Sequence, residues 1–235
     1  MTETGAAQPN PINVCVIFGG RSSEHNISCL SAASVLAALD RTRYSVQAVG
    51  ITKSGDWYRV SDDPHDWVRV GDQLPEVVAT PNPTSLSSIS ADVVFPVLHG
   101  PFGEDGTIQG LLELAGVRYV GAGVLASAVG MDKHYMKVVF AGSGLPVLPH
   151  VLVTTKAWRH DPDSIREAVS SLGFPVFVKP CRGGSSFGIS KVHILDHLDA
   201  AIDSAAEHDP RVLVEASAPV GSREIECGVI GGASG

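Results

Sequence analysis

The sequence has 235 residues, 44% of them hydrophobic and 18% charged, which is enough apolar material for a packed core. Its net charge of −8 comes without a basic stripe, so a nucleic-acid partner is not expected. The 4 cysteines are scattered and lack C-x-x-C spacing, which argues against a structural zinc site and favours a reducing cytoplasm. Residues 1–11 resemble a disordered tail rather than a signal peptide, and no apolar run could span a bilayer.

Strands and helices alternate through the first half of the sequence. Apolar runs predict strands at 14–18, 44–51, 57–60 and 93–98. Helical spacing of apolar residues predicts helices over 27–39 and 108–115, the second ended by Gly116. The stretch 61–90 is rich in Pro, Asp and Ser and predicts a loop. Such alternation is typical of an α/β fold with a parallel sheet and helices on both faces.

A second set of elements follows residue 122. Strands are predicted at 151–153, 176–178, 189–194, 212–214 and 225–230, with helices that begin after Asp132 and over 165–172 and 198–205. The predicted domains are a tail at 1–11, a first domain at 12–121, a second at 122–215 and the start of a third at 216–235. Because the strand at 225–230 has no sheet to join, we expect the chain to be truncated there.

The segment 99–110, HGPFGEDGTIQG, lies between a predicted buried strand and a predicted helix. Ligands of α/β proteins bind at this edge of a parallel sheet, where the backbone N–H groups of a helix start face an anion. Glu104 and Asp105 also suit the dipole of that helix. The alternative is a tight connection whose acids only cap the helix.

The segment 18–28, FGGRSSEHNIS, has a strand end, two glycines and a polar loop that enters a helix. This arrangement makes a niche for an anion or a zwitterion, and it is not a P-loop because no Gly-Lys-Ser/Thr follows. The alternative is an ordinary strand-to-helix turn with Glu24 in the first helical turn.

The segment 177–188, FVKPCRGGSSFG, delivers Lys179 from an apolar strand into a Gly/Ser-rich loop. Such a loop can donate backbone N–H groups to phosphates while the lysine neutralises their charge. The alternative is a flexible hairpin with a lysine in solvent.

These three segments together resemble the D-alanine–D-alanine ligases of bacterial cell-wall synthesis, which are ATP-grasp enzymes. Segment 99–110 matches the family signature H-G-x-x-G-E-D-G-x-x-Q-G position by position. The resemblance implies an α/β fold with a Rossmann-like parallel-sheet domain, followed by an ATP-grasp α+β subdomain and a C-terminal ATP-grasp domain that is only begun.

The resemblance also implies roles for individual residues. The catalytic group would comprise Glu24, which anchors the ammonium of the first D-alanine, with Ser185 and His99 in its network. The nucleotide would be bound by Lys133, Lys179, Gly184, Ser185, Ser186, Glu215 and Glu224. In that set the lysines and the Gly/Ser loop contact phosphates, Glu215 the adenine amino group and Glu224 the ribose. The linker 216–220 is slightly longer than usual in the family.

The implied reaction couples ATP hydrolysis to peptide-bond formation through an acyl phosphate, and ATP and Mg²⁺ would be required. In the family the metal ligands and the second D-alanine site lie C-terminal to Gly235, so no metal ligand is assigned here and the 235 residues alone are expected to be inactive. A cytoplasmic homodimer is the family expectation. The alternatives are a ligase that takes D-lactate or D-serine second, and a non-catalytic ATP-binding module.

Two shorter matches point elsewhere. Residues 184–188 fit the G-x-S-x-G elbow of serine hydrolases, but that elbow needs a helix after Ser186 and the sequence predicts a strand. Residues 121–126 fit G-x-G-x-x-A of dinucleotide-binding proteins, but no acid closes a following strand. We interpret 121–126 as a connection between domains.

Overall fold

The computed structural model describes residues 10–184 and 187–231, which form two compact units. The first unit comprises residues 1–143 and 181–187, and the second comprises 144–180 and 188–235. The tail predicted at 1–11 lies, as far as residue 9, outside the described residues. The domain boundaries after residues 121 and 215 stay predictions. Within the described ranges, no helix combines the length and apolar character needed to cross a membrane.

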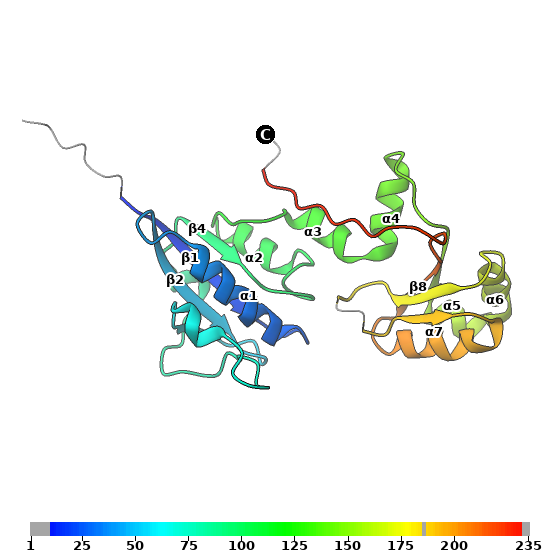
Figure 1. Cartoon of the computed structure of the whole chain (residues 1–235), viewed down its shortest axis with the longest axis horizontal. Helices are drawn as coiled ribbons and strands as arrows, with labels where there is room; N and C mark the ends of the chain where they lie inside the picture. The colour runs from blue at the N-terminus through cyan, green and yellow to red at the C-terminus, as the bar shows by residue number, and fades with distance from the viewer. Residues whose placement is uncertain (1–9, 185–186, 232–235) are drawn as a thin grey trace, which may run out of the picture. The chain divides into compact units, whose positions relative to one another are not determined.

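The first unit is built on a four-stranded sheet in the order β3-β2-β1-β4 (Figure 1). Its strands are β1 (Ile12–Gly19), β2 (Tyr44–Ile51), β3 (Trp57–Val60) and β4 (Val93–Pro96). β1 pairs in parallel with β2 and with β4, whereas β3 adds to the edge antiparallel. The predicted strands and the predicted parallel sheet are therefore confirmed.

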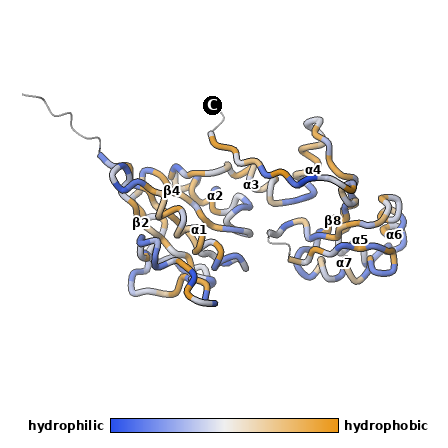
Figure 2. The backbone as a smooth tube through the Cα atoms, viewed as in Figure 1, coloured by the Kyte–Doolittle hydropathy of each residue, from blue (hydrophilic) through white to orange (hydrophobic). Residues whose placement is uncertain are grey.

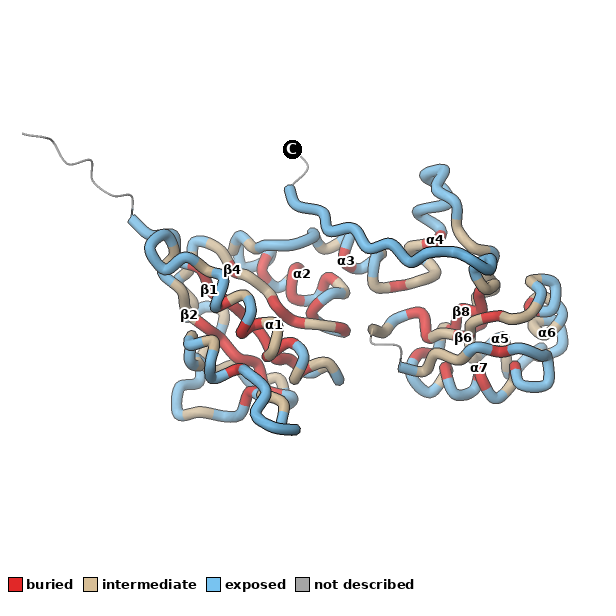
Figure 3. The backbone as a smooth tube through the Cα atoms, viewed as in Figure 1, coloured by how far each residue is buried: buried red, intermediate tan, exposed pale blue. Residues whose placement is uncertain are grey.

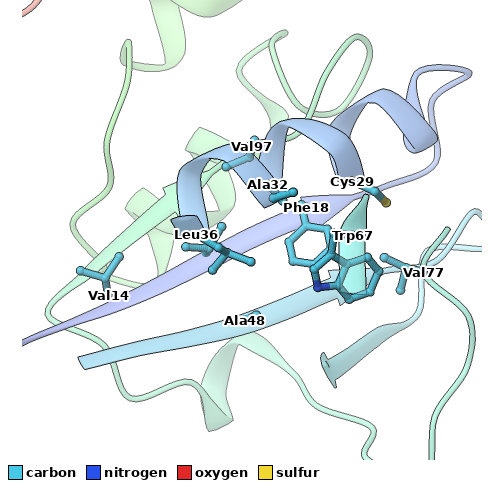
Figure 4. Close-up of a cluster of buried hydrophobic side chains, with 11 residues drawn as sticks. Val14, Phe18, Cys29, Ala32, Leu36, Ala48, Trp67, Val77 and Val97 are labelled. Atoms are coloured by element: carbon cyan, nitrogen blue, oxygen red, sulfur yellow. The ribbon is translucent and has the colours of Figure 1, made fainter. Parts of the chain in front are cut away.

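Helices cover both faces of this sheet, as the sequence predicts. Side chains alternate along β1, so Val16 and Phe18 pack with helix α1 (His25–Ala38) on one face (Figure 4). Cys15 and Ile17 pack with helix α2 (Thr107–Leu114) on the other face. β1 is thus buried on both sides, which explains its unbroken apolar sequence.

The stretch 61–90 is irregular, as predicted, but it is not loose. It contains two 3₁₀ turns, η1 (Pro64–Trp67) and η2 (Leu86–Ser88), and otherwise no helix or strand. Trp67 is buried with its ring edge-on to Phe18, 4.7 Å between centroids, and Val77 is buried in the same cluster (Figure 4). The stretch therefore closes the core on the side of α1.

Two helices complete the first unit. Helix α4 (Lys133–Gly142) begins as predicted at Asp132, whose carboxylate accepts hydrogen bonds from the backbone N–H groups of His134 and Tyr135, both at 3.1 Å. Helix α3 (Val124–Met131) was not predicted. Its residues are apolar or small on every side, so the sequence lacks the polar stripe that marks an amphipathic helix.

The second unit carries an antiparallel sheet in the order β5-β8-β6-β7. Its strands are β5 (His150–Thr154), β6 (Val176–Pro180), β7 (Ser190–Val192) and β8 (Arg211–Ala216). Its helices are α5 (Thr155–His160), α6 (Pro162–Ser170) and α7 (Leu198–Ala206), with a short turn η3 (Leu195–His197) before α7. Val178 and Val214 face these helices in one core, whereas their strand neighbours face away. This is the predicted α+β subdomain, to which the structure adds α5.

The strand predicted at 225–230 was wrong. Residues 217–231 have no helix or strand, and residues 218–231 are exposed throughout (Figure 3). Apolar residues are frequent at 225–230, as in a strand (Figure 2), yet Ile225 is 76% and Ile230 102% exposed. A strand needs a partner for its backbone hydrogen bonds, and none pairs with this segment among the described residues.

Burial shields three of the cysteines, Cys15, Cys29 and Cys181, from reagents. It raises the pKa of the Cys15 and Cys29 thiols to about 12, whereas Cys227 is exposed. At pH 8 the Cys15 and Cys29 thiols are therefore ionised to only about one part in ten thousand. We expect a disulfide reagent to label Cys227 rapidly in the folded chain and all 4 cysteines after unfolding. Cys227→Ser should abolish the rapid phase; a rapid thiol that survives in this variant would contradict the assignment.

Candidate functional site

Two loops leave the carboxyl edge of the parallel sheet and are tied together by serines. β1 ends at Gly19 and β4 at Pro96. The Ser28 hydroxyl of α1 accepts a hydrogen bond from the Gly19 N–H at 2.7 Å and donates one to the Val97 carbonyl at 2.6 Å. The Ser22 hydroxyl donates to the His99 carbonyl at 2.7 Å. The two glycine-rich segments predicted as sites therefore form one structure.

A buried histidine that the sequence reasoning missed fixes the first loop. The Val77 N–H donates to His25 Nε2 at 3.0 Å, so Nε2 carries no proton in this arrangement. His25 Nδ1 lies 2.7 Å from the Gly20 carbonyl and therefore donates to it. His25 thus links the glycine loop to the irregular stretch 61–90. Nothing in the sequence indicates a contact between positions 52 residues apart.

The Glu24 carboxylate rests against the backbone of two glycines in the first unit. A Cβ atom added to Gly100 would lie 2.2 Å from Glu24 Oε2, and one added to Gly184 would lie 2.9 Å from Oε1. Gly100 also has φ +68°, which favours glycine. Glu24 itself is half-buried at the start of α1. The first unit, which includes residues 181–187, therefore brings together residues from all three predicted segments.

His99 and Glu104 form a partly exposed ion pair beside Glu24. His99 Nδ1 lies 3.7 Å from Glu104 Oε1, and Glu104 Oε2 accepts the Gly100 N–H at 2.7 Å. Glu104 raises the pKa of His99 above its usual value, against the opposing effect of burial, and Glu24 adds to the rise. His99 in turn lowers the pKa of Glu104. Both groups are thus favoured in their charged forms near neutral pH.

The other residues of segment 99–110 hold its shape. Asp105 accepts hydrogen bonds from the backbone N–H groups of Phe102 at 2.9 Å and Thr107 at 3.0 Å. The buried Gln109 side chain donates to the Gly103 carbonyl at 2.9 Å. For Asp105 the structural alternative, an acid that caps the start of α2, agrees with these contacts.

Lys133 reaches the glycine-rich loop within the same unit. Its Nζ donates to the Gly183 carbonyl at 2.8 Å, and its backbone N–H donates to the Cys181 carbonyl at 2.9 Å. The pairing of Asp132 with Arg182 adds a further link. Lys133 is therefore held against this loop. Ser185 and Ser186, the next residues of the loop, lie outside the described residues.

In the second unit Lys179 and Glu215 form an ion pair. Lys179 Nζ lies 2.6 Å from Glu215 Oε2, with side chains 22% and 9% exposed. Phe177 faces Glu215 directly across the β6–β8 pairing, which makes Lys179 a diagonal neighbour of that glutamate. Both charged side chains alternate with core valines, so they lie on the sheet face opposite the helices.

Three predictions remain, one for Glu224 and one for each of the two shorter motif matches. Glu224 is exposed in the irregular segment after β8. Gly188 is followed by strand β7, so the helix that a hydrolase elbow requires is missing there. Residues 121–126 lead into α3 and then α4, with no intervening strand that an acid could close.

Known proteins resemble the chain along nearly its whole length. Residues 13–122 match the family model described as the D-ala D-ala ligase N-terminus, and 139–235 match that of the C-terminus. A D-alanine–D-alanine ligase from Arthrobacter sp. (strain FB24) is 54% identical over 250 residues, which cover 98% of this chain and 64% of that protein.

Two solved structures share the fold. The D-alanine-D-alanine ligase from Coxiella burnetii is 32% identical with a TM-score of 0.73, covering 88% of this chain and 64% of that one. The VanG D-Ala:D-Ser ligase from Enterococcus faecalis is 37% identical with a TM-score of 0.72, covering 88% and 63%. The chain thus spans less than two thirds of the length of these relatives. The predicted ATP-grasp architecture is confirmed, and the chain belongs to the D-alanine–D-alanine ligase family.

Proposed function

We propose that this protein is an ATP-dependent ligase that joins two D-alanine molecules into D-alanyl-D-alanine for peptidoglycan precursors. In the reaction, the carboxylate of the first D-alanine attacks the γ-phosphate of ATP, which gives an acyl phosphate and ADP. The amine of the second D-alanine then attacks the acyl carbon, loses a proton and displaces inorganic phosphate. The observation that supports this proposal most is the Glu24 carboxylate, held against Gly100 and Gly184 by three family motifs.

Glu24 is proposed to bind the ammonium group of the first D-alanine. A half-buried carboxylate attracts a small ammonium more strongly than an exposed one, because less water screens the charge. His99 is proposed to hold the loop that backs Glu24, since its carbonyl accepts the Ser22 hydroxyl and its ring contacts Glu104. Ser185 is proposed to join the same network.

The nucleotide is proposed to contact Lys133, Lys179, Gly184, Ser185 and Ser186 through its phosphates, Glu215 through its adenine amino group and Glu224 through its ribose. The Lys179–Glu215 pair supports this assignment, because it places an ammonium and a carboxylate together on the sheet face opposite the helices. Phosphate oxygens and an amino group would offer each member of the pair a new partner. The lysines would stabilise the negative charge that develops during phosphoryl transfer.

Mg²⁺ is proposed to accompany ATP, where it would neutralise phosphate charge. The described residues contain no group of three or more His, Cys, Asp or Glu side chains placed to hold a metal ion. We propose that its ligands, and the second substrate site, come from the part of the family's length that this chain does not span.

A second candidate is a ligase that joins D-alanine to D-serine, because the VanG D-Ala:D-Ser ligase is among the similar solved structures. D-lactate as second substrate is the related alternative. The test is mass spectrometry of the products that a form extended to the full family length makes from ATP with D-alanine alone and with equal D-alanine, D-serine and D-lactate. We expect D-alanyl-D-alanine to dominate both mixtures; a mixed product in excess would favour the second candidate. The protein is further proposed to be a cytoplasmic homodimer, which sedimentation would test.

Gly100, whose backbone lies against the Glu24 carboxylate, allows a direct test of the proposed substrate niche. Gly100→Ala should abolish D-alanine binding, because the new Cβ would lie 2.2 Å from the Glu24 carboxylate and push it aside. Gly116 is a matched control, since its φ of +67° nearly equals the +68° of Gly100 and a Cβ there meets nothing within 4 Å. Gly116→Ala should cost about 1 kcal/mol of unfolding free energy for the left-handed backbone alone. Calorimetric titration with D-alanine and urea unfolding measure both; equal D-alanine affinities in the two variants would contradict the niche.

A further inference from the structure

Both ring nitrogens of His99 have a partner, and one partner comes from α1. Ser31 Oγ lies 2.8 Å from His99 Nε2, while Glu104 Oε1 lies 3.7 Å from Nδ1 on the other side of the ring. Ser31 follows Glu24 by seven residues, about two helical turns, so the two side chains lie on the same face of the helix. Ser31 belongs to none of the three motifs, although it touches one of them.

The two partners of the ring differ in their hydrogen-bonding capacity: Glu104 only accepts, whereas Ser31 can donate or accept. An ionised carboxylate only accepts hydrogen bonds, so Glu104 attracts the proton on Nδ1 whether the ring is neutral or charged. Nε2 then carries no proton in the neutral ring and carries one in the imidazolium. A hydroxyl can donate to the first state and accept from the second, and Ser31 therefore suits both.

The charge on His99 matters because two carboxylates face it. Glu104 lies on the loop that precedes α2, Glu24 lies at the start of α1, and Ser31 supplies a neutral dipole from α1. The His99 carbonyl is bonded to the Ser22 hydroxyl, which in turn accepts the Glu24 N–H at 3.2 Å. A ring that turned away would thus disturb the charge beside Glu24 and the loop that supports it.

We infer that Ser31 is a positioning residue of the D-alanine site, which keeps the His99 ring between Glu104 and α1 in both of its protonation states. The inference rests on the proposed function, since it assumes that Glu24 binds D-alanine. The hydroxyl lets the charge of His99 follow the substrate or the pH while the loop 99–104 keeps its conformation. A carboxylate or an ammonium at position 31 would suit one state of the ring alone.

The test compares Ser31→Thr with Ser31→Val, which are nearly equal in size and helix propensity and differ in the hydroxyl. Nitrogen-15 spectra of the imidazole report the hydrogen bond at each ring nitrogen of His99. We expect Nε2 of the neutral ring to show the shift of a nitrogen that accepts a hydrogen bond in the wild type and in Ser31→Thr, and the shift of one without that bond in Ser31→Val, while Nδ1 stays protonated beside Glu104 in all three. Ser31→Ala, which is smaller and introduces no clash, should shift in the same direction.

The affinity for D-alanine tests whether the loss of the Ser31 hydroxyl also affects the proposed substrate site. Ser31→Val should weaken D-alanine affinity about tenfold, the cost of one hydrogen bond to a charged group, while Ser31→Thr stays within about twofold of wild type. ATP affinity should be the same in all variants. Spectra or D-alanine affinities that do not separate valine from threonine would overturn the inference. Failure of the wild type to bind D-alanine would instead overturn the proposed function, so the two failures are distinguishable.

Discussion

Replacing Lys179 by methionine is expected to lower the affinity for ATP by about a hundredfold or more. The change keeps the length of the side chain and removes the charge proposed to face the phosphates. It also deprives the mostly buried Glu215 of the ammonium that lies 2.6 Å away, so the unfolding free energy should fall by about 2 kcal/mol. Calorimetric titration with a non-hydrolysable ATP analogue and urea unfolding measure the two effects.

Lys191 offers a matched control for this variant. It lies on the adjacent strand β7, and its Nζ is 5.4 Å from the centre of the same Phe177 ring that Lys179 contacts. Because Lys191 is exposed, Lys191→Met should change neither ATP affinity nor stability by more than experimental error. Equal ATP affinities for the two methionine variants would remove Lys179 from the nucleotide site.

Replacing Glu24 by glutamine is expected to lower the affinity for D-alanine by about a hundredfold while leaving ATP affinity unchanged. The amide has the same shape as the carboxylate, so the contacts with Gly100 and Gly184 are kept. The negative charge that would pair with the substrate ammonium is lost, and the amide N–H₂ cannot accept a hydrogen bond from it. In a form extended to the full family length, D-alanine-dependent ATP turnover should fall with the affinity.

Glu76→Gln is the control for Glu24, because Glu76 is an exposed carboxylate of the same unit, paired with Lys53 at the surface. It should leave D-alanine binding intact. A protein that binds ATP without chemistry would respond to Lys179→Met and be indifferent to Glu24→Gln. That pattern would favour the non-catalytic ATP-binding module over the ligase.

The fold was largely predictable because its strands carry local signals. β1 has an unbroken apolar run since it is covered on both faces, and Asp132 starts α4 with a side chain that suits a helix cap. The wrong strand prediction concerns a segment whose secondary structure depends on pairing with another strand. The segment 225–230 is rich in apolar residues like a strand, yet no strand among the described residues pairs with it, and its backbone is irregular and exposed.

The sequence allows candidate site residues to be proposed, but it does not specify the contacts that they make. Glu24, His99 and Lys179 stand in glycine-rich motifs that sequence spacing can recognise. Lys179 pairs with Glu215 because β6 lies antiparallel to β8, and no pattern in either strand specifies that pairing. Ser31 lies 68 residues from His99 and looks like any polar residue of a helix.

The most direct test of the central claim is phosphate release, coupled to a colour reaction, with ATP, Mg²⁺ and D-alanine. It should be measured on residues 1–235 and on a form extended to the full family length. We expect the longer form to release phosphate only when D-alanine is present, with one D-alanyl-D-alanine formed for each phosphate, and the shorter form to release none. Phosphate release that is indifferent to D-alanine, or turnover by residues 1–235 alone, would contradict the account.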